Sequence, residues 1–105
     1  MQEKLNTITN AIEDLKGKEV IIFNVAKKTS EMSYIVIATG NSKQHIASIA
    51  NNVRQEVKLK DFFVKPLEGE TTDWILVDCG DIVVHIMTQT SREFYNLEKL
   101  WKIIE

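Results

Sequence analysis

Residues that break, kink or cross-link a chain are scarce in this sequence. Its 105 residues include four glycines, one proline and one cysteine. Such a composition excludes collagen-like and low-complexity chains. The single cysteine, Cys79, excludes an internal disulfide and the thiolate clusters of zinc-finger or iron–sulfur sites. A lone thiol suits a reducing compartment, so we expect a cytoplasmic protein.

Long apolar runs and an excess of basic charge are also missing. No stretch approaches the roughly 18 consecutive apolar residues of a membrane span, and the first residues lack the apolar core of an export signal. Thirteen basic and fifteen acidic residues leave a formal net charge of −2, which gives no electrostatic drive towards phosphate backbones. We therefore expect neither membrane insertion nor sequence-specific nucleic-acid binding.

The remaining composition is that of a folded protein, with 44% hydrophobic and 27% charged residues. A chain of this length can build one hydrophobic core, so we expect a single domain over residues 1–105. Runs rich in β-branched and aromatic residues predict about five strands. These strands cover residues 20–25, 34–39, 62–65, 73–78 and 81–87.

Apolar residues spaced three and four apart predict three helices around these strands. The first helix has an apolar stripe of Leu5, Ile8, Ile12 and Leu15. The second has a stripe of Ile46, Ile49, Ala50, Val53 and Val57. The third has a stripe of Phe94, Leu97, Trp101 and Ile104. The order of elements predicts an α/β protein of the mixed α+β kind, with a mixed sheet of about five strands flanked by helices.

Turn and capping residues set the predicted boundaries. Gly17 is expected to end the first helix in the left-handed conformation that a helix C-cap favours. The second helix is expected to begin with Asn41 as N-cap and Gln44 in the reciprocal position, and the third with a capping box over residues 90–93. The last two strands are separated by Cys79 and Gly80 alone, which predicts a tight hairpin.

Two places could bind an ionic ligand. The turn at residues 40–42 precedes a helix, and a helix N-terminus favours phosphate. It has neither the repeated glycines of a dinucleotide loop nor the lysine of a P-loop, so capping alone explains it. Asp78 and Asp81 flank the hairpin turn and could share a divalent cation, but no further carboxylate completes an oxygen cage. They are typical of turn residues that bond their own backbone, and we predict no metal site and no cofactor.

Neither histidine has the neighbours of a catalytic base. Cys79 and His85 could act as nucleophile and base, but the hairpin register separates them by five residues, roughly 16 Å along the strands. His45 lies near the edge of its helix's apolar stripe, and no acid that would orient it can be identified. We interpret His45 as a half-buried packing or partner-contact residue.

The two faces of the predicted hairpin differ in composition. If Asp78 lies opposite Asp81, then Leu76 lies opposite Val83, and Trp74 opposite His85. One face is then purely aliphatic, with Ile75, Val77, Ile82, Val84 and Ile86. The other face holds Trp74, Leu76, Val83, His85 and Met87.

The mixed face has two interpretations. Tryptophan and methionine are enriched where proteins dock, which predicts a partner-contact surface. The alternative is that a helix covers this face and that Trp74 belongs to the core. Arg92 and Tyr95, three apart on the last helix, could extend the contact surface, or they could lie on a solvated flank.

Two segments of the chain resemble the ribosomal silencing factor family, also called RsfS or Iojap. They are W-I-L-V-D-C-G-D-I-V-V-H-I-M, from Trp74 to Met87, and S-R-E-F-Y-N-L-E-K-L-W, from Ser91 to Trp101. Y-I-V-I-A-T-G-N-S, which leads to His45, and L-E-G-E, which precedes Trp74, also match segments of that family. The resemblance therefore covers nearly the whole chain.

The resemblance implies a translation regulator without catalytic activity or cofactor. Family members bind the large ribosomal subunit through its ribosomal protein number fourteen, block joining of the small subunit and lower translation when nutrients are short. Organellar relatives are linked to large-subunit assembly, which is an alternative role, and members are often homodimers. By motif position, the contact residues would be Trp74, Leu76, His85 and Met87, with Glu68, Asp78, Arg92 and Tyr95 as neighbours.

The family's fold is similar to a nucleotidyltransferase core, which raises a second alternative, a nucleotide-binding protein. Nucleotidyltransferases follow a Gly-Ser turn with an Asp-x-Asp pair that holds magnesium. Here the turn at residues 40–42 is followed by Lys43, Gln44 and His45, and Asp-x-Asp occurs nowhere in the sequence. We therefore expect the fold without the enzymatic activity.

Overall fold

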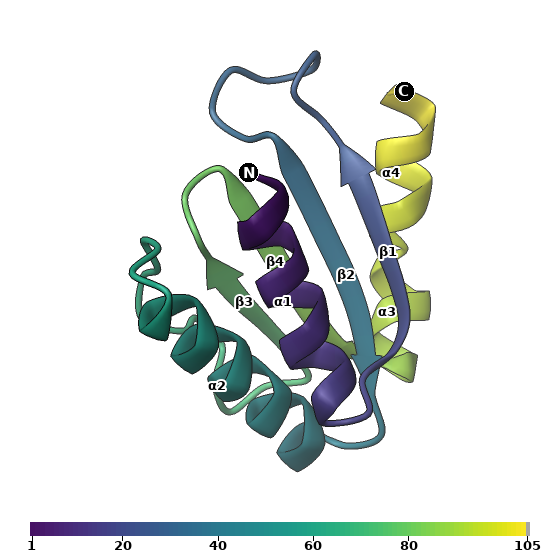
Figure 1. Cartoon of the computed structure of the whole chain (residues 1–105). Helices are drawn as coiled ribbons and strands as arrows, with labels where there is room; N and C mark the ends of the chain where they lie inside the picture. Colours follow the sequence, from purple (N-terminus) through teal and green to yellow (C-terminus); the bar gives the residue numbers. More distant parts are fainter. Residues whose placement is uncertain (105) are drawn as a thin grey trace.

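In the computed structural model of the protein, one mixed sheet has helices on both of its faces (Figure 1). The structure describes the backbone of residues 1–104 and the side chains of residues 1–101. The elements are α1 (Gln2–Asp14), β1 (Lys18–Asn24), β2 (Tyr34–Gly40), α2 (Lys43–Leu59), β3 (Trp74–Asp78), β4 (Ile82–Thr88), α3 (Gln89–Tyr95) and α4 (Leu97–Ile104). Among helices in the described part of the chain, none is both long and apolar enough to cross a bilayer.

The sheet has four strands in the order β1-β2-β4-β3. β2 and β4 are parallel at the centre, and β1 and β3 pair antiparallel at the two edges.

The prediction of a mixed sheet flanked by helices is confirmed, and the prediction of a fifth strand is wrong. Residues 62–65 form no strand: the Lys65 N–H donates to the Asp78 carbonyl at 2.9 Å, and Glu68 makes one isolated bridge to Leu76. Since Pro66 has no N–H, the intervening segment cannot continue a ladder along β3.

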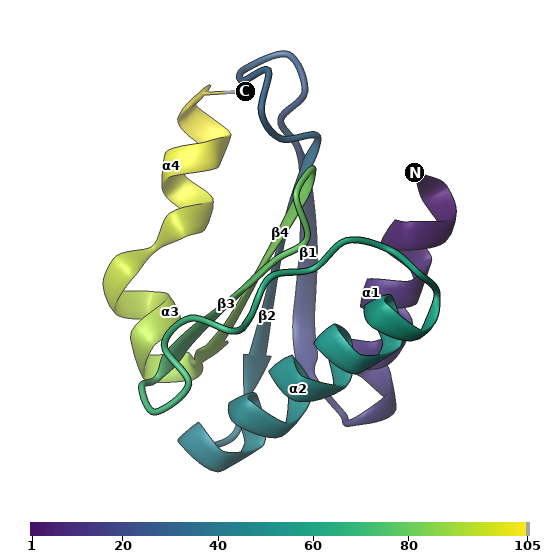
Figure 2. The ribbon, with the colours of Figure 1, turned by 90° about the vertical axis from the view of Figure 1, so that its left-hand side faces the viewer.

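The sheet lies between α1 and α2 on one side and α3 and α4 on the other (Figure 2). An apolar cluster fills each of the two sides. Between the sheet and the pair α1 and α2 lies the larger cluster, which includes the aliphatic hairpin face around Ile75, Val84 and Ile86. On the opposite side, α4 packs through Leu97 and Trp101 against a smaller cluster. That smaller cluster is built on Phe23, Val25, Ile35, Ile37 and Met87.

The ends of the first two helices differ from the prediction in their details. Lys16, with φ 64°, takes the left-handed conformation expected of Gly17. Gly17 is needed for a different reason, because a Cβ there would lie 2.4 Å from Cγ2 of Ile12. The N-cap of α2 is Ser42, not Asn41, and its hydroxyl accepts from the His45 N–H at 3.0 Å.

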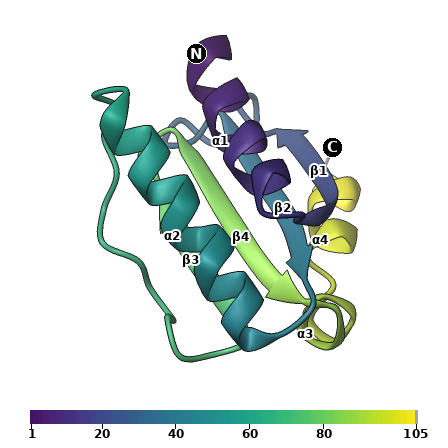
Figure 3. The same ribbon diagram turned by 60° about the horizontal axis from the view of Figure 1, so that its bottom comes forward.

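The C-terminal segment forms two helices where one was predicted (Figure 3). α3 begins directly after β4, with Thr88 as its N-cap, so the predicted capping box at residues 90–93 lies inside the helix. Asn96, with φ 47°, ends α3 in the left-handed conformation. This break rotates α3 out of the register of α4, and Phe94, predicted to be buried, is 79% exposed. The side chain of Ile104 lies outside the described residues.

The hairpin register also differs from the prediction. Asp78 lies opposite Val83, Leu76 opposite His85 and Trp74 opposite Met87, a shift of two residues. The turn therefore spans residues 79–82, closed by a hydrogen bond from the Cys79 N–H to the Ile82 carbonyl at 2.9 Å. Because side chains alternate with a period of two, a shift of two leaves every residue on its predicted face.

Candidate partner-contact surface

One sheet face is only partly covered by helices. α4 lies beside β1 and β2, where Leu97 and Trp101 pack on the smaller cluster, whereas β3 is at the far edge of the sheet (Figure 1). On this face, β3 and β4 present side chains that remain partly accessible. We name the aromatic patch by its residues, which are Trp74, Leu76, Val83, His85, Phe94 and Tyr95.

Aromatic rings form a continuous row across the patch. The ring centroids of Trp74 and His85 are 5.9 Å apart, and those of Trp74 and Tyr95 are 4.7 Å apart. Phe94 meets Tyr95 edge to face at 5.0 Å. Tyr95 is 50% exposed, so the row is half-buried at His85 and Trp74 and open to solvent at its α3 end. Exposed aromatic rings in a row are typical of docking surfaces.

His85 is held as a neutral ring. Trp74 Nε1–H donates to His85 Nδ1 at 3.0 Å, so His85 accepts through that nitrogen. Burial lowers the pKa of His85 to about 4, because a half-buried imidazolium would lose its hydration. At neutral pH the patch therefore contains no imidazolium charge.

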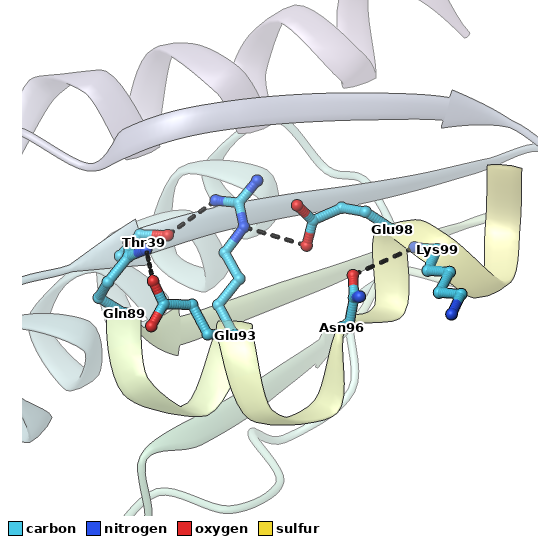
Figure 4. A network of polar contacts seen from close by, with 7 residues as sticks. Thr39, Gln89, Glu93, Asn96, Glu98 and Lys99 are labelled. Atoms are coloured by element: carbon cyan, nitrogen blue, oxygen red, sulfur yellow. Dashed lines mark hydrogen bonds and ion pairs between the residues drawn. The ribbon is translucent and has the colours of Figure 1, made fainter.

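Two predicted contact residues are buried. Met87, which lies opposite Trp74 on the neighbouring strand, is fully enclosed in the smaller cluster. Arg92 is 4% exposed, with Nη1 donating to Thr39 Oγ1 at 2.7 Å and Nε donating to Glu98 Oε1 at 3.2 Å (Figure 4). The prediction that Arg92 extends an exposed flank is wrong, because α3 turns this residue towards β2. Arg92 instead ties α3 to the sheet and to α4.

The predicted acidic neighbours lie at the margin of the patch. Glu68 is exposed, and its backbone exchanges two hydrogen bonds with Leu76 at 3.1 and 2.9 Å. Asp78 is half-buried; its Oδ1 accepts from the Gly80 N–H at 2.9 Å, and its Oδ2 lies 3.5 Å from the Lys65 ammonium. The interpretation of Asp78 as a turn residue is thus confirmed. Gly80 itself has φ 84°, which only glycine adopts freely.

The groups at the two possible ionic-ligand sites, the hairpin turn and the turn at residues 40–42, form contacts within the protein. Asp81 pairs with the buried Lys4 ammonium at 2.7 Å, so it does not face Asp78 as a cation ligand. In the turn at residues 40–42, His45 Nδ1 accepts from the Asn41 N–H at 2.8 Å, and His45 Nε2 bonds the Leu15 carbonyl at 2.7 Å. Across the described residues, no three His, Cys, Asp or Glu side chains form a group that could hold a metal ion.

Cys79 and His85 occupy different sides of the sheet. Cys79 is buried in the larger cluster, and burial raises the pKa of its thiol to about 11. His85 belongs to the opposite face with Trp74. The thiol therefore stays protonated and packs as a small apolar group.

Sequence reasoning missed Phe94 as a surface residue. It assigned Phe94 to the buried stripe of a single long helix that also contained Leu97. The signal that could have found it is Asn96, since asparagine is one of the few residues that adopt the left-handed conformation at a helix end.

Comparison with known proteins identifies the family. The model of the family described as "Ribosomal silencing factor during starvation" matches residues 1–105. A ribosomal silencing factor of Chromobacterium violaceum is 37% identical over 102 residues, which are 96% of this chain and 84% of that protein.

A crystal structure of a Chromobacterium violaceum protein is similar with a TM-score of 0.93 and 36% identity, over 96% of this chain and 85% of that one. The mouse protein "Mitochondrial assembly of ribosomal large subunit protein 1" is 28% identical over 94% of this chain and 45% of its own length. Because the family model matches residues 1–105 and a bacterial member is 37% identical, the chain belongs to the ribosomal silencing factor family, whose members are not enzymes.

Proposed function

We propose that the protein represses translation by docking its aromatic patch on ribosomal protein number fourteen of the large subunit, where its bulk blocks the small subunit. Membership of the silencing-factor family supports binding to the large subunit. The observation that carries the choice of surface is the series of contacting rings from His85 to Phe94, which is half-buried at His85 and Trp74 and exposed at Tyr95 and Phe94.

The patch has the layout of a protein-contact surface. Its centre holds Trp74 and Leu76, which are half-buried and apolar, and its margin holds the carboxylates of Glu68 and Asp78. Aromatic centres supply most of the affinity in such surfaces, while marginal charges mainly orient the partner and speed association. A protein of net charge −2 with acidic groups at this margin fits a basic ribosomal protein.

Size is sufficient for a steric mechanism. The molecule measures 34 × 34 × 20 Å, with a radius of gyration of 12.6 Å, close to the ~13 Å expected of a compact chain of this length. A body of this thickness on the joining face of the large subunit prevents close contact between the subunits. The step needs no bond making and no cofactor.

Co-sedimentation with isolated ribosomal subunits tests the proposal. The purified protein should pellet with the large subunit and not with the small one, and its presence should lower the yield of joined ribosomes when both subunits are mixed. Binding to the small subunit alone, or unchanged joining at saturating protein, would refute the silencing mechanism.

A photo-crosslinking amino acid identifies the ribosomal partner. Placed at position 94 it should cross-link to ribosomal protein number fourteen, because Phe94 is 79% exposed at the open end of the patch. The matched control is position 59, since Leu59 is 69% exposed at the end of α2, which covers the sheet face opposite the patch. Cross-linking of position 94 to another ribosomal protein would leave large-subunit binding intact and refute the finer assignment.

The same proposal places the protein in the cytoplasm, where it meets ribosomes, and allows a homodimer. A homodimer built on the aromatic patch would compete with the ribosome. Sedimentation velocity of the free protein, alone and with large subunits, tests this: a dimer that dissociates on binding would indicate a shared surface.

A further inference from the structure

The contact between Trp74 and His85 fixes where His85 carries its proton. The indole Nε1–H can only donate, so the nitrogen it contacts at 3.0 Å, His85 Nδ1, has to be the unprotonated one. A neutral imidazole has one N–H, which is then on Nε2. Trp74 therefore selects one tautomer of the ring.

The Nε2–H of this tautomer has no partner among residues 1–101. Within that same range Ser91 Oγ is the one side-chain polar atom that is both buried and without a hydrogen bond. His85 Nε2 is not such an atom, so it reaches the molecular surface. A donor is thus presented on the aromatic patch between apolar side chains.

We infer that His85 Nε2–H donates a hydrogen bond to an uncharged carbonyl oxygen of the protein docked on the aromatic patch, and that Trp74 is the positioning residue for this bond. This inference rests on the proposed function and names the chemistry at the centre of the same surface. The hydrogen bond from His85 would favour a partner segment in which one carbonyl oxygen accepts no hydrogen bond from the partner itself.

An uncharged acceptor fits better than a carboxylate or phosphate. Within the described chain His85 forms no hydrogen bond or ion pair with a cationic side chain, and its ring neighbour is an indole. An anion buried there would lose its hydration without a compensating positive charge. The Lys65 ammonium, further along the patch margin, is already paired with the Asp78 carboxylate at 3.5 Å, so it does not compensate a second anion at His85.

The tautomer can be tested without any partner. In nitrogen NMR spectra of the free protein at neutral pH, with signals assigned by their loss in His85→Gln, His85 Nδ1 should appear as an unprotonated acceptor and Nε2 as protonated. In Trp74→Phe, which keeps a ring but lacks the indole N–H, the two shifts should move towards the average of exchanging tautomers. A protonated Nδ1 in the unchanged protein would overturn the inference.

Binding to large subunits tests the bond itself. His85→Gln keeps both functions, since its amide oxygen can accept from Trp74 and its amide N–H can donate outward, and it should bind within about twofold of the unchanged protein. His85→Phe keeps the ring and loses the donor, and it should bind about tenfold more weakly, the effect of one lost hydrogen bond to a desolvated acceptor. Unfolding curves confirm that both variants are folded under the assay conditions.

Each result decides a different point. Equal binding by His85→Phe and the unchanged protein, or an equal loss in both variants, would overturn the inference and leave the proposed function standing. Absence of large-subunit binding by the unchanged protein would overturn both. The ratio between His85→Phe and the unchanged protein should not vary with salt; a ratio that shrinks as salt rises would mean a charged acceptor and would overturn the carbonyl assignment.

Discussion

Phe94→Ala separates binding from folding more cleanly than any substitution at Trp74. Because Phe94 is 79% exposed, about a fifth of its side chain contributes to the fold. Full burial of such a side chain stabilises by ~1.5–3 kcal/mol, so the buried fifth contributes about 0.5 kcal/mol. The edge-to-face contact with Tyr95 adds about 0.5 kcal/mol at most for a pair so exposed. The free energy of unfolding should therefore fall by no more than about 1 kcal/mol.

The same residue has most of its area available for a partner. An aromatic side chain buries ~150–250 Å² when enclosed, and the exposed four fifths, at ~25 cal/mol per Å², set a ceiling of about 3–5 kcal/mol for docking. Because Phe94 lies at the end of the patch and not at its centre, alanine truncation should remove about 1 kcal/mol, which corresponds to roughly a fivefold higher Kd.

Urea unfolding and large-subunit co-sedimentation measure the two quantities. Leu59→Ala is the matched control, because it removes an apolar side chain of similar exposure from the end of α2 and should alter neither Kd nor subunit joining. The reasoning would be refuted by wild-type affinity of Phe94→Ala, or by a loss of stability above about 2 kcal/mol, which would place Phe94 in the core after all.

Four further substitutions test the structure. Between pH 6.5 and about 4, the unfolded chain binds a proton at His85 that the folded chain does not, because the pKa of His85 is lowered on folding. The free energy of unfolding should therefore fall by up to ~3 kcal/mol as the pH drops through this window. In His85→Gln, urea unfolding at each pH should show no such loss. Gly17→Ala should lower the free energy of unfolding by ~1–3 kcal/mol, because the added Cβ clashes with Ile12. Lys16→Gly should raise it by ~0.5–1 kcal/mol, because glycine adopts the left-handed conformation of this position more easily than lysine. If thermal unfolding gave the opposite signs, Gly17 and not Lys16 would be the left-handed residue. Arg92→Met should cost ~2–4 kcal/mol in chemical unfolding, since it leaves Glu98 and Thr39 without their buried partner, and a neutral result would show that α3 is held without it.

Hydrophobic periodicity predicted the helices whose apolar stripe faces the core along their whole length. α2 shows this best: Ile46, Ile49 and Val53 were predicted to be buried and are. The two hairpin faces were also assigned correctly, although the register was shifted by two. A period of two fixes which face a residue lies on, but it does not fix the residue opposite, which depends on the turn length.

Features that depend on polar contacts between distant parts of the chain could not be predicted from the sequence. Arg92 looks like a surface residue by type, and its burial depends on Thr39, 53 positions away in β2. The prediction of a fifth strand was wrong for a different reason. Residues 62–65 are of types common in strands, but Pro66 has no N–H and interrupts the pairing with β3. Met87 was assigned to the correct face, and only the packing of Trp74 and α4 shows that it is enclosed.

The parallel pairing of β2 with β4 has a consequence for synthesis. β2 is buried from Ile35 to Gly40, and one of its two neighbours, β4, is translated more than forty residues later. Lys4 of α1 likewise finds its partners, the Cys79 carbonyl and Asp81, only when the hairpin exists. A nascent chain that ends before β4 thus has an open sheet edge at β2 and no hairpin to hold the partners of Lys4 in place. The central parallel pair of the sheet can therefore form only after β4 has been translated, so the sheet cannot fold strand by strand in the order of synthesis.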